Sequence, residues 1–293
     1  MVQSKKLEFV GYIVIGLFAL AIIIPFVLLL VSSLTDETTI SRNGYDFWPE
    51  TWSVDAYKYL VQHGPMILRA YLITIGVTVV GTLLSLCFTS LCAYPLSRQD
   101  LPGLTGLKFF VFFTMLFNGG LIPTYLMYTQ IFHIKNNLLA LIIPNLLMTG
   151  YYVNLARSFY ATSIPVALIE AARLDGASEF RTFFQIVMPL SKPIMATLGM
   201  FIAVGYWNDW QNGLIYITDS NLFSIQALLN KMTSDIQFLQ NNSHFASNVS
   251  LMDLPSQSVR MAIAVVGLIP MFCAYPFFQK YFVKGITLGA VKE

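Results

Sequence analysis

The sequence predicts an all-α integral membrane protein with six transmembrane helices. Of its 293 residues, 56% are hydrophobic and only 11% are charged, whereas a soluble domain carries about 25% charged residues. The mean hydropathy is +0.65. Six apolar segments reach the length of about 20 residues that a membrane helix needs, with approximate limits 9–34, 67–96, 107–130, 138–160, 192–217 and 260–283. We expect one transmembrane domain over residues 1–293.

The first segment follows two lysines, as the apolar part of a secretory signal does. Its apolar run from Phe9 to Leu34 is much longer than the roughly 7–15 residues of a signal, and no small-residue cleavage site follows it. We therefore interpret it as an uncleaved first span.

The other five segments are too long for buried strands, and helices satisfy their own backbone hydrogen bonds in hydrocarbon. Four spans contain a proline in their interior, which removes a backbone donor and bends a helix. We expect kinks at Pro25, Pro123, Pro144 and Pro270.

The distribution of basic residues predicts that both termini lie in the cytoplasm of a multi-pass protein of the cell membrane. With that orientation eleven of the seventeen Lys and Arg residues lie inside, which agrees with the excess of positive charge in cytoplasmic loops. The inner residues are Lys5, Lys6, Arg98, Lys108, Arg157, Arg173, Arg181, Lys192, Lys280, Lys284 and Lys292. Large outer loops are then expected near 35–66 and 218–259, and a cytoplasmic loop at about 161–191.

The loop at 161–191 has the local signals of a helix, a turn and a second helix. Ser163 is expected to cap the first helix, which Pro165 helps to start. Asp175-Gly176 is expected to end it, because glycine adopts the left-handed conformation of a helix C-terminus. Ser178 is expected to cap the second helix, with Glu179 near its positive end.

The second helix is expected to bury one apolar stripe and to end at Pro189. The stripe consists of Phe180, Phe183, Phe184 and Val187. An amphipathic helix lying on lipid headgroups is the alternative, but that role favours a basic polar face. Here acids and bases are mixed, so we favour a docking surface for a partner protein.

The loop resembles the EAA loop of ATP-binding-cassette (ABC) importer permeases, in which Glu-Ala-Ala precedes a glycine and an Ile-x-Leu-Pro sequence. The matching residues are Glu170, Ala171, Ala172, Gly176, Ile186 and Pro189. Met188 replaces the usual leucine, which nearly conserves side-chain volume. The segments "RSFYATSIPVALIEAARLDGAS" and "YWNDWQN" are similar to carbohydrate permeases of the MalG type, and "YFVKGITLGAVKE" to their LplC/YtcP-like branch, apart from Glu293.

The resemblance implies a type I ABC importer permease fold and a function in carbohydrate uptake, most simply of an oligosaccharide. In that family the EAA loop couples to a separate ATPase, which agrees with the lack of a phosphate-binding G-x-x-x-x-G-K-[ST] sequence here. The implied partners are a second homologous permease subunit, two ATPase subunits that bind the ATP, and an extracellular solute-binding protein. No cofactor is expected in this chain itself.

Polar and aromatic residues of the fourth and fifth spans are candidates for the transport path. They are Asn145, Trp207, Asn208, Asp209, Trp210 and Asn212. On a continuous fifth helix Asn208 and Asn212 would share one face, and amides beside aromatic rings suit a sugar. The alternative is an interfacial aromatic belt with ordinary polar neighbours, and for Asn145 a hydrogen bond between helices.

The sequence offers no support for catalysis, a metal site or nucleic-acid binding. Its three histidines lack ligand spacing, its three cysteines lie in apolar runs, and its net charge is only +2. An importer of another solute class remains an alternative. A secondary transporter is a weaker one, because it would show ionisable residues near mid-membrane and internal repeats.

Overall fold

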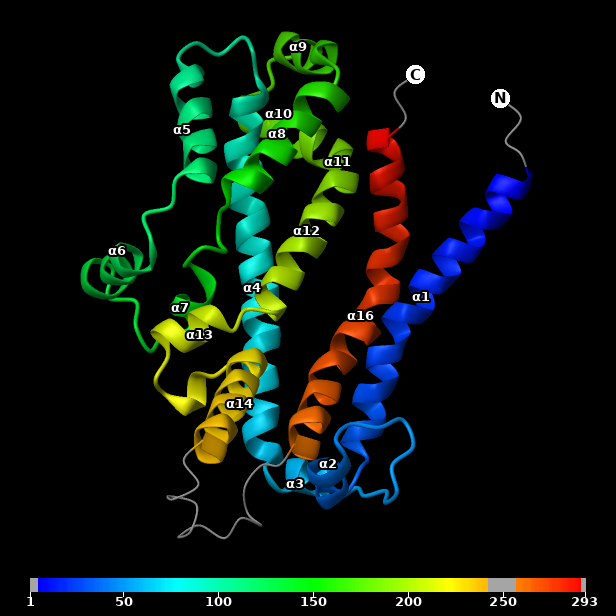
Figure 1. Ribbon diagram of the computed structural model, residues 1–293. Helices are drawn as coiled ribbons and strands as arrows, with labels where there is room; N and C mark the ends of the chain where they lie inside the picture. Colours follow the sequence, from blue (N-terminus) through cyan, green and yellow to red (C-terminus); the bar gives the residue numbers. More distant parts are fainter. Residues whose placement is uncertain (1–4, 242–256, 291–293) are drawn as a thin grey trace. The chain divides into compact units, whose positions relative to one another are not determined.

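The computed structural model describes residues 5–241 and 257–290, and every regular element within these ranges is a helix (Figure 1). One isolated β-bridge joins Thr35 to Trp52. The chain forms two compact units. Of the described residues, unit 1 contains 5–68, 228–241 and 257–271, and unit 2 contains 69–227 and 272–290.

Unit 1 begins with the long helix α1 (Lys5–Ser33), followed by α2 (Glu37–Asn43) and α3 (Asp55–Gln62). It also holds most of α14 (Ile225–Asn241) and the first part of α16 (Gln257–Ala290). Its core is small and apolar, and joins α3 to α16 through Ala56, Leu60, Val259, Ala262 and Ile263. The most apolar stretch of α1 is wholly unburied, as expected of a helix whose environment is lipid or another subunit.

Unit 2 contains α4 (Gly64–Ser97) from Arg69 onward, α5 (Leu104–Leu116) and α6 (Leu121–Leu126), which continues as a π-helical turn at Met127–Ile131. Next come α7 (Leu139–Ile142) and α8 (Gly150–Ser163). The chain continues through α9 (Val166–Leu174), α10 (Glu179–Thr182), a π-helical turn (Phe183–Val187) and α11 (Met188–Leu190). These elements are followed by α12 (Lys192–Trp207), α13 (Gln211–Tyr216) and a 3-10 turn (Ser220–Leu222).

The first, second and sixth predicted spans are each one helix, but the three middle ones are interrupted. Among the described residues, two helices are long and apolar enough to cross a membrane, or up to four if each bent pair counts as one span. The count of six spans therefore stays a prediction. The break between α5 and α6 turns the helix axis by 115°.

Glycine, proline and asparagine account for two of these breaks. Gly120 has φ +85° just before α6, and Asn145 has φ +62° just after Pro144. Left-handed φ values of this kind end a helix, and only glycine and, among other residues, chiefly asparagine adopt them readily. Pro144 thus lies at an interruption of the fourth predicted span rather than at a kink within a continuous helix.

The carbonyls that the break after α7 leaves free are bonded by side chains from the end of α12 and from α13. The Tyr206 hydroxyl donates to the Ile142 carbonyl at 2.8 Å, and the Asn212 side-chain amide donates to the Pro144 carbonyl at 3.0 Å. These bonds lie in a buried part of unit 2, where an unpaired carbonyl would be costly. Irregular backbone is therefore stable here.

Candidate functional site

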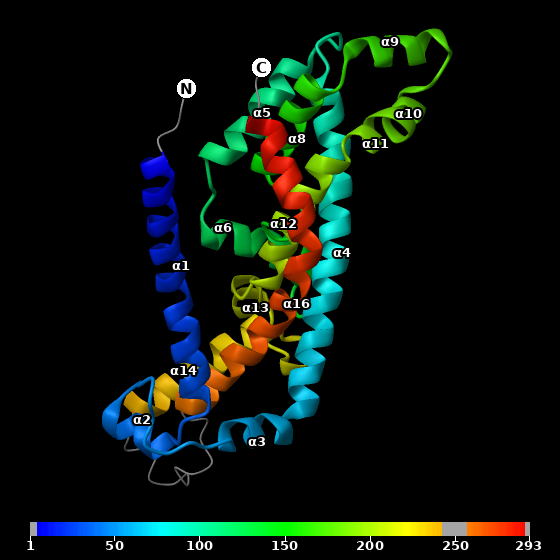
Figure 2. The same ribbon diagram turned by 90° about the vertical axis from the view of Figure 1, so that its right-hand side faces the viewer.

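The segment between α8 and α12, residues 164–191, forms a bent arm that we call the elbow. In Figure 2, α9 leads away from α8, and α10 and α11 lead back toward α12. The prediction that Ser163 caps α9 is wrong, because Ser163 is the last residue of α8. Pro165 occupies the position before α9, and no side chain caps the start of α9.

The turn at the tip of the elbow has the predicted form. Asp175 follows the last residue of α9, and Gly176 has φ +75°. The Ala177 amide donates to the Ala172 carbonyl at 2.9 Å, a bond that closes a helix C-terminus. Ser178 then caps α10, since its hydroxyl accepts from the Arg181 amide at 3.3 Å.

The return limb of the elbow does not bury one apolar stripe. Phe183 and Val187 are buried, whereas the side chains of Phe180 and Phe184 are 72% and 58% exposed. Phe180 and Phe184 are four residues apart, as are Phe183 and Val187, so each pair lies on its own face of the limb. The segment Phe183–Val187 is a π-helical turn. The limb also runs through Pro189 and ends at Leu190. The predicted single stripe and the predicted end at Pro189 are therefore corrected.

The six residues that match the EAA sequence are mostly at the surface. Glu170, Ala171, Gly176 and Pro189 are exposed, Ile186 is half-buried and Ala172 is buried. At the tip, Leu174 is 90% exposed. The elbow thus presents a carboxylate, a small side chain and large apolar side chains together on its outer surface.

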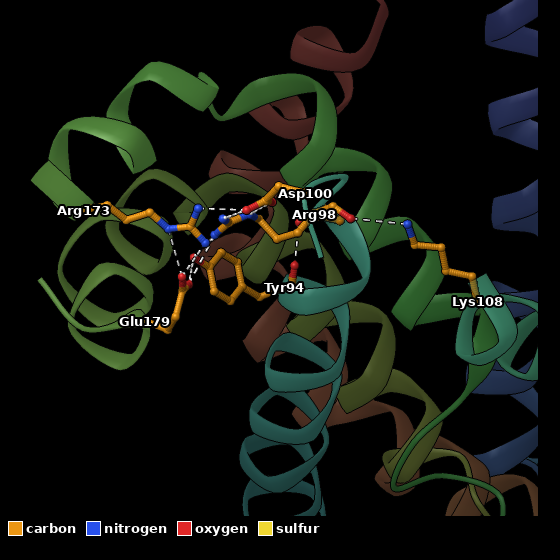
Figure 3. Close-up of polar contacts among 7 residues, drawn as sticks. Tyr94, Arg98, Asp100, Lys108, Arg173 and Glu179 are labelled. Carbon is orange, nitrogen blue, oxygen red and sulfur yellow. Dashed lines mark hydrogen bonds and ion pairs between the residues drawn. The ribbon is translucent and has the colours of Figure 1, made fainter. Parts of the chain in front are cut away.

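Four charged side chains join the tip of the elbow to the end of α4 (Figure 3). Arg98 binds Asp100 through two parallel bonds of 2.7 and 2.6 Å, and Asp100 also accepts from Arg173 at 2.8 Å. Arg173 binds Glu179 at 2.7 Å, and Arg98 reaches the other oxygen of Glu179 at 3.2 Å. The four side chains form a closed loop of alternating sign, which we call the charge ring.

The charge ring keeps its carboxylates ionised. The Arg98 guanidinium, with help from Arg173, holds the pKa of Asp100 well below its usual range. Arg173 is the main cause of the lowered pKa of Glu179, and the same bonds raise the pKa values of both arginines. Charge-assisted bonds favour the charged forms of both partners.

Beside the charge ring, Tyr94 of α4 makes an uncharged contact with the elbow. Its hydroxyl donates to Glu179 at 3.0 Å, and its aromatic ring packs 5.3 Å from that of Phe183, between centroids. Beside it lies an open apolar notch of about 220 Å³. The notch is lined by Leu91, Tyr94, Pro95, Leu101, Glu179, Phe180 and Phe183.

The charge ring was not predicted from the sequence. Arg98 and Arg173 were considered only as positive charges on the inner side, and Asp100 was not considered. Asp100 and Arg173 are 73 residues apart, and a single sequence carries no sign of such a pairing. The available signal was local: Arg173 and Glu179 flank the predicted turn closely enough for their bond to be expected.

The structure divides the candidates for the transport path. α12 ends at Trp207 and α13 begins at Gln211, so the fifth span is not one continuous helix and the predicted shared face of Asn208 and Asn212 does not exist. The Asp209 carboxylate accepts from the Asn212 amide at 3.2 Å, as expected of a short polar side chain at a helix start. Asn208 and Asp209 therefore lie at the break between α12 and α13, rather than along one face of a continuous helix.

Their exposure differs as well. Asn208, Trp210 and Asn145 are exposed, whereas Trp207 and Asn212 are buried and Asp209 is half-buried. Asn212 holds a backbone carbonyl, as described above, a structural role that was expected only as the alternative for Asn145 of the fourth span.

The whole chain resembles known transport proteins. Residues 4–288 match the family described as binding-protein-dependent transport system inner membrane component. The chain is 36% identical to the polygalacturonan/rhamnogalacturonan transport system permease protein YtcP of Bacillus subtilis (strain 168), over 99% of both chains. It is also 36% identical to the protein LplC of the same organism, over 92% of this chain and 89% of that one.

A solved structure has a similar fold. It is the crystal structure of a bacterial ABC transporter involved in the import of the acidic polysaccharide alginate. The matched chain is 27% identical in sequence, and the TM-score is 0.78 over 95% of this chain and 97% of that one. Similarity therefore extends over both units and is not confined to the elbow.

Proposed function

The chain belongs to the family of binding-protein-dependent transport system inner membrane components, and from this premise we propose that it is the permease subunit of an ABC importer for an oligosaccharide. It forms half of the translocation path. The elbow couples this path to a separate ATPase. The observation that carries the proposal is the match at 36% identity over almost the whole length to a polygalacturonan/rhamnogalacturonan transport system permease protein, together with the fold shared with the alginate importer.

The surface of the elbow supports the coupling role. The charge ring supports an aqueous environment for the tip, because four charged groups would be costly inside hydrocarbon. Leu174 and Phe180 are nevertheless largely exposed there. Large apolar side chains gathered at a watery surface are typical of a contact with another protein. Glu170 can form an ion pair with a basic residue of the partner. The notch beside Phe180 can bind an apolar side chain of the partner.

The proposed orientation puts the elbow and both termini in the cytoplasm, which follows the excess of basic residues on that side. The assembly then contains a second homologous permease, two ATPase subunits that bind ATP, and an extracellular solute-binding protein. Within the path, we propose the exposed residues Asn145, Asn208 and Trp210 as sugar contacts, because amides bond hydroxyls and an indole face stacks on a sugar ring.

Substitutions in the elbow test this function. Proline cannot adopt the φ of +75° at Gly176, because its ring fixes φ near −65°. Glu170→Lys reverses an exposed charge without disturbing any described bond. The test substrate is an oligogalacturonide, because the relative YtcP is a polygalacturonan/rhamnogalacturonan transport system permease protein. Both variants are expected to lose uptake of labelled oligogalacturonides in cells that carry the whole transporter, while the amount of permease in the membrane stays unchanged.

Two control variants separate coupling from general damage. Gly106→Ala replaces a glycine that has open space around it and no positive φ, and Glu50→Lys reverses an exposed charge in the loop before α3. Both should transport as the wild type does. Normal uptake by Gly176→Pro and Glu170→Lys would overturn the coupling role of the elbow.

A further inference from the structure

The charge ring joins two parts of the chain that local folding does not join. Arg98 and Asp100 lie at the end of α4, whereas Arg173 is in the last turn of α9 and Glu179 in the first turn of α10. The two residues from the elbow stand on either side of Gly176. The ring therefore holds the tip of the elbow, where α9 turns back into α10, against α4 (Figure 3).

Arg98 is the centre of this attachment. Its side chain is only 7% exposed, whereas those of Asp100, Arg173 and Glu179 are 41–51% exposed. Its guanidinium donates to Asp100, to Glu179 and to the Tyr94 hydroxyl. An exposed ion pair contributes little, but a closed network around a buried bidentate arginine has a fixed geometry. Lys108 also binds the Arg98 carbonyl at 3.4 Å, which brings the start of α5 to the same corner.

The covalent connections of the elbow are poor at transmitting force. Its return limb meets α12 at Ser191 through a bend of 79°, and its outgoing limb meets α8 through the extended residues Ile164 and Pro165. Bends and extended residues of this kind can absorb rotation as hinges do. A force applied to the tip alone would therefore be absorbed by rotation at the two ends of the elbow, unless the tip were fixed to a long helix.

We propose that Arg98 is a positioning residue that makes the elbow and α4 move as one body, so that displacement of the elbow is carried along α4. This inference rests on the proposed function of the elbow as the contact with the ATPase. α4 is suited to the task because it is one unbroken helix of 34 residues. It also packs tightly on α12, since Tyr206 lies directly over Gly81.

The alternative is that the charge ring only helps the elbow to fold. The two roles differ in what they predict for the assembled transporter. A folding role lowers transport and ATP hydrolysis together, because fewer complexes assemble. A transmitting role lowers the amount of sugar moved per ATP hydrolysed, because the ATPase still docks and turns over but its motion is no longer passed on.

The first experiment measures motion directly in the complete transporter. After the native cysteines are replaced by serine, spin labels are attached at Leu83→Cys on α4 and Ala177→Cys at the tip. Leu83 lies fifteen residues before Arg98, about 22 Å away along the helix axis, so the two labels lie on opposite sides of the contact between α4 and the elbow. The distance distribution should be the same without nucleotide and with trapped ADP-vanadate. A shifted distribution in the otherwise unmodified protein would overturn the proposal.

The second experiment compares Arg98→Gln with Arg181→Gln in proteoliposomes. Arg181 is an exposed arginine of the same elbow whose side chain binds only Gln185 among the described contacts, outside the charge ring, so it is a matched control for this ratio. Arg98→Gln should lower the ratio of oligogalacturonide transported to ATP hydrolysed by roughly fivefold or more, the range typical of coupled sites. Arg181→Gln should leave it unchanged, and an unchanged ratio in Arg98→Gln would overturn the proposal.

Two further measurements keep the outcomes distinct. If Arg98→Gln fails to assemble, Arg173→Gln replaces it, because Arg173 is partly exposed and its removal leaves Arg98 bound to both carboxylates. The ratio should then fall less, but still below that of Arg181→Gln. Failure of the unmodified chain to co-purify with the ATPase would count against the proposed function itself, whatever the ratios are.

Discussion

The carboxylates of Asp100 and Glu179 each lie between two guanidinium groups, and this environment makes the stability that the charge ring contributes depend on pH in a defined way. Both carboxylates have lowered pKa values in the folded protein. A depressed folded pKa contributes stability above the unfolded pKa, and this stability is lost as the pH falls through the folded value. The unfolded value for these groups is about 4, so the attachment is complete at neutral pH.

We predict that Asp100→Asn lowers the unfolding temperature of the purified transporter by the same amount from pH 7 to pH 5. Below about pH 4 the difference from wild type should shrink, because Asp100 of the unfolded wild-type chain takes up a proton there while that of the folded chain is still ionised, which favours unfolding. Thermal unfolding followed by intrinsic fluorescence measures this. The partners Arg98 and Arg173 stay charged throughout, so a difference that changed between pH 7 and pH 5 would contradict the assignment.

Single residues of the elbow show what a sequence can and cannot predict. Gly176 and Ser178 were predicted correctly, because a left-handed turn and a helix cap depend on neighbours within three residues. The cap at Ser163 was wrong because α8 continues through that serine. The Arg98–Glu179 pair was missed because it depends on where α4 ends in space, and sequence patterns alone do not determine that.

At the scale of elements, helices pack closely only where small residues allow it. In α4, a side chain added at Gly81 would approach the Tyr206 aromatic ring of α12 to 2.5 Å. Tyr206 cannot easily move aside, because it is buried and its hydroxyl holds the Ile142 carbonyl. A glycine at this point therefore sets the separation of the two helices.

We predict that Gly81→Ala destabilises the protein by about 1–3 kcal/mol, the usual cost of overpacking. Gly76→Ala is the matched control, since it lies in the same helix with open space around it. It should be neutral or stabilising by up to about 1 kcal/mol, because glycine weakens a helix interior. Unfolding in mixed micelles of increasing SDS content measures both. Equal stability of the two variants would show that the α4–α12 contact is looser than described.

The apolar regions were predicted, but the breaks in their helices were not, and the reason is physical. Hydropathy reports which segments prefer an apolar environment, and it located all six apolar regions. It does not report whether the backbone within a region is regular. The break at Asn145 is stable because distant groups bond the freed backbone, as Asn212 does for the Pro144 carbonyl. After Asn208, the Ser224 hydroxyl does the same for the Asp209 carbonyl, whereas the described bonds of Gly120 are to its neighbours Asn118 and Thr124. Asn208 was interpreted as part of a continuous face because that compensation is invisible in the sequence.

At the scale of the whole molecule, the fold class followed from composition, and the family from a gapped sequence signal that the full-length comparisons confirm. Neither signal shows how an energy source reaches the path. In the proposed function, the exposed apolar side chains at the tip of the elbow contact the ATPase, and the charge ring connects the same tip to α4. A permease of this kind should be inert alone.

We therefore predict that the purified chain, reconstituted by itself into liposomes, neither hydrolyses ATP nor moves oligogalacturonides, with or without a proton or sodium gradient. The 293 residues contain no phosphate-binding loop to hold ATP, and the unburied apolar stretch of α1 leaves a surface for lipid or another subunit. With the second permease, the ATPase pair and the binding protein present, ATP should restore uptake. Accumulation by the lone chain along an ion gradient would instead establish a secondary transporter, and the elbow would need another explanation.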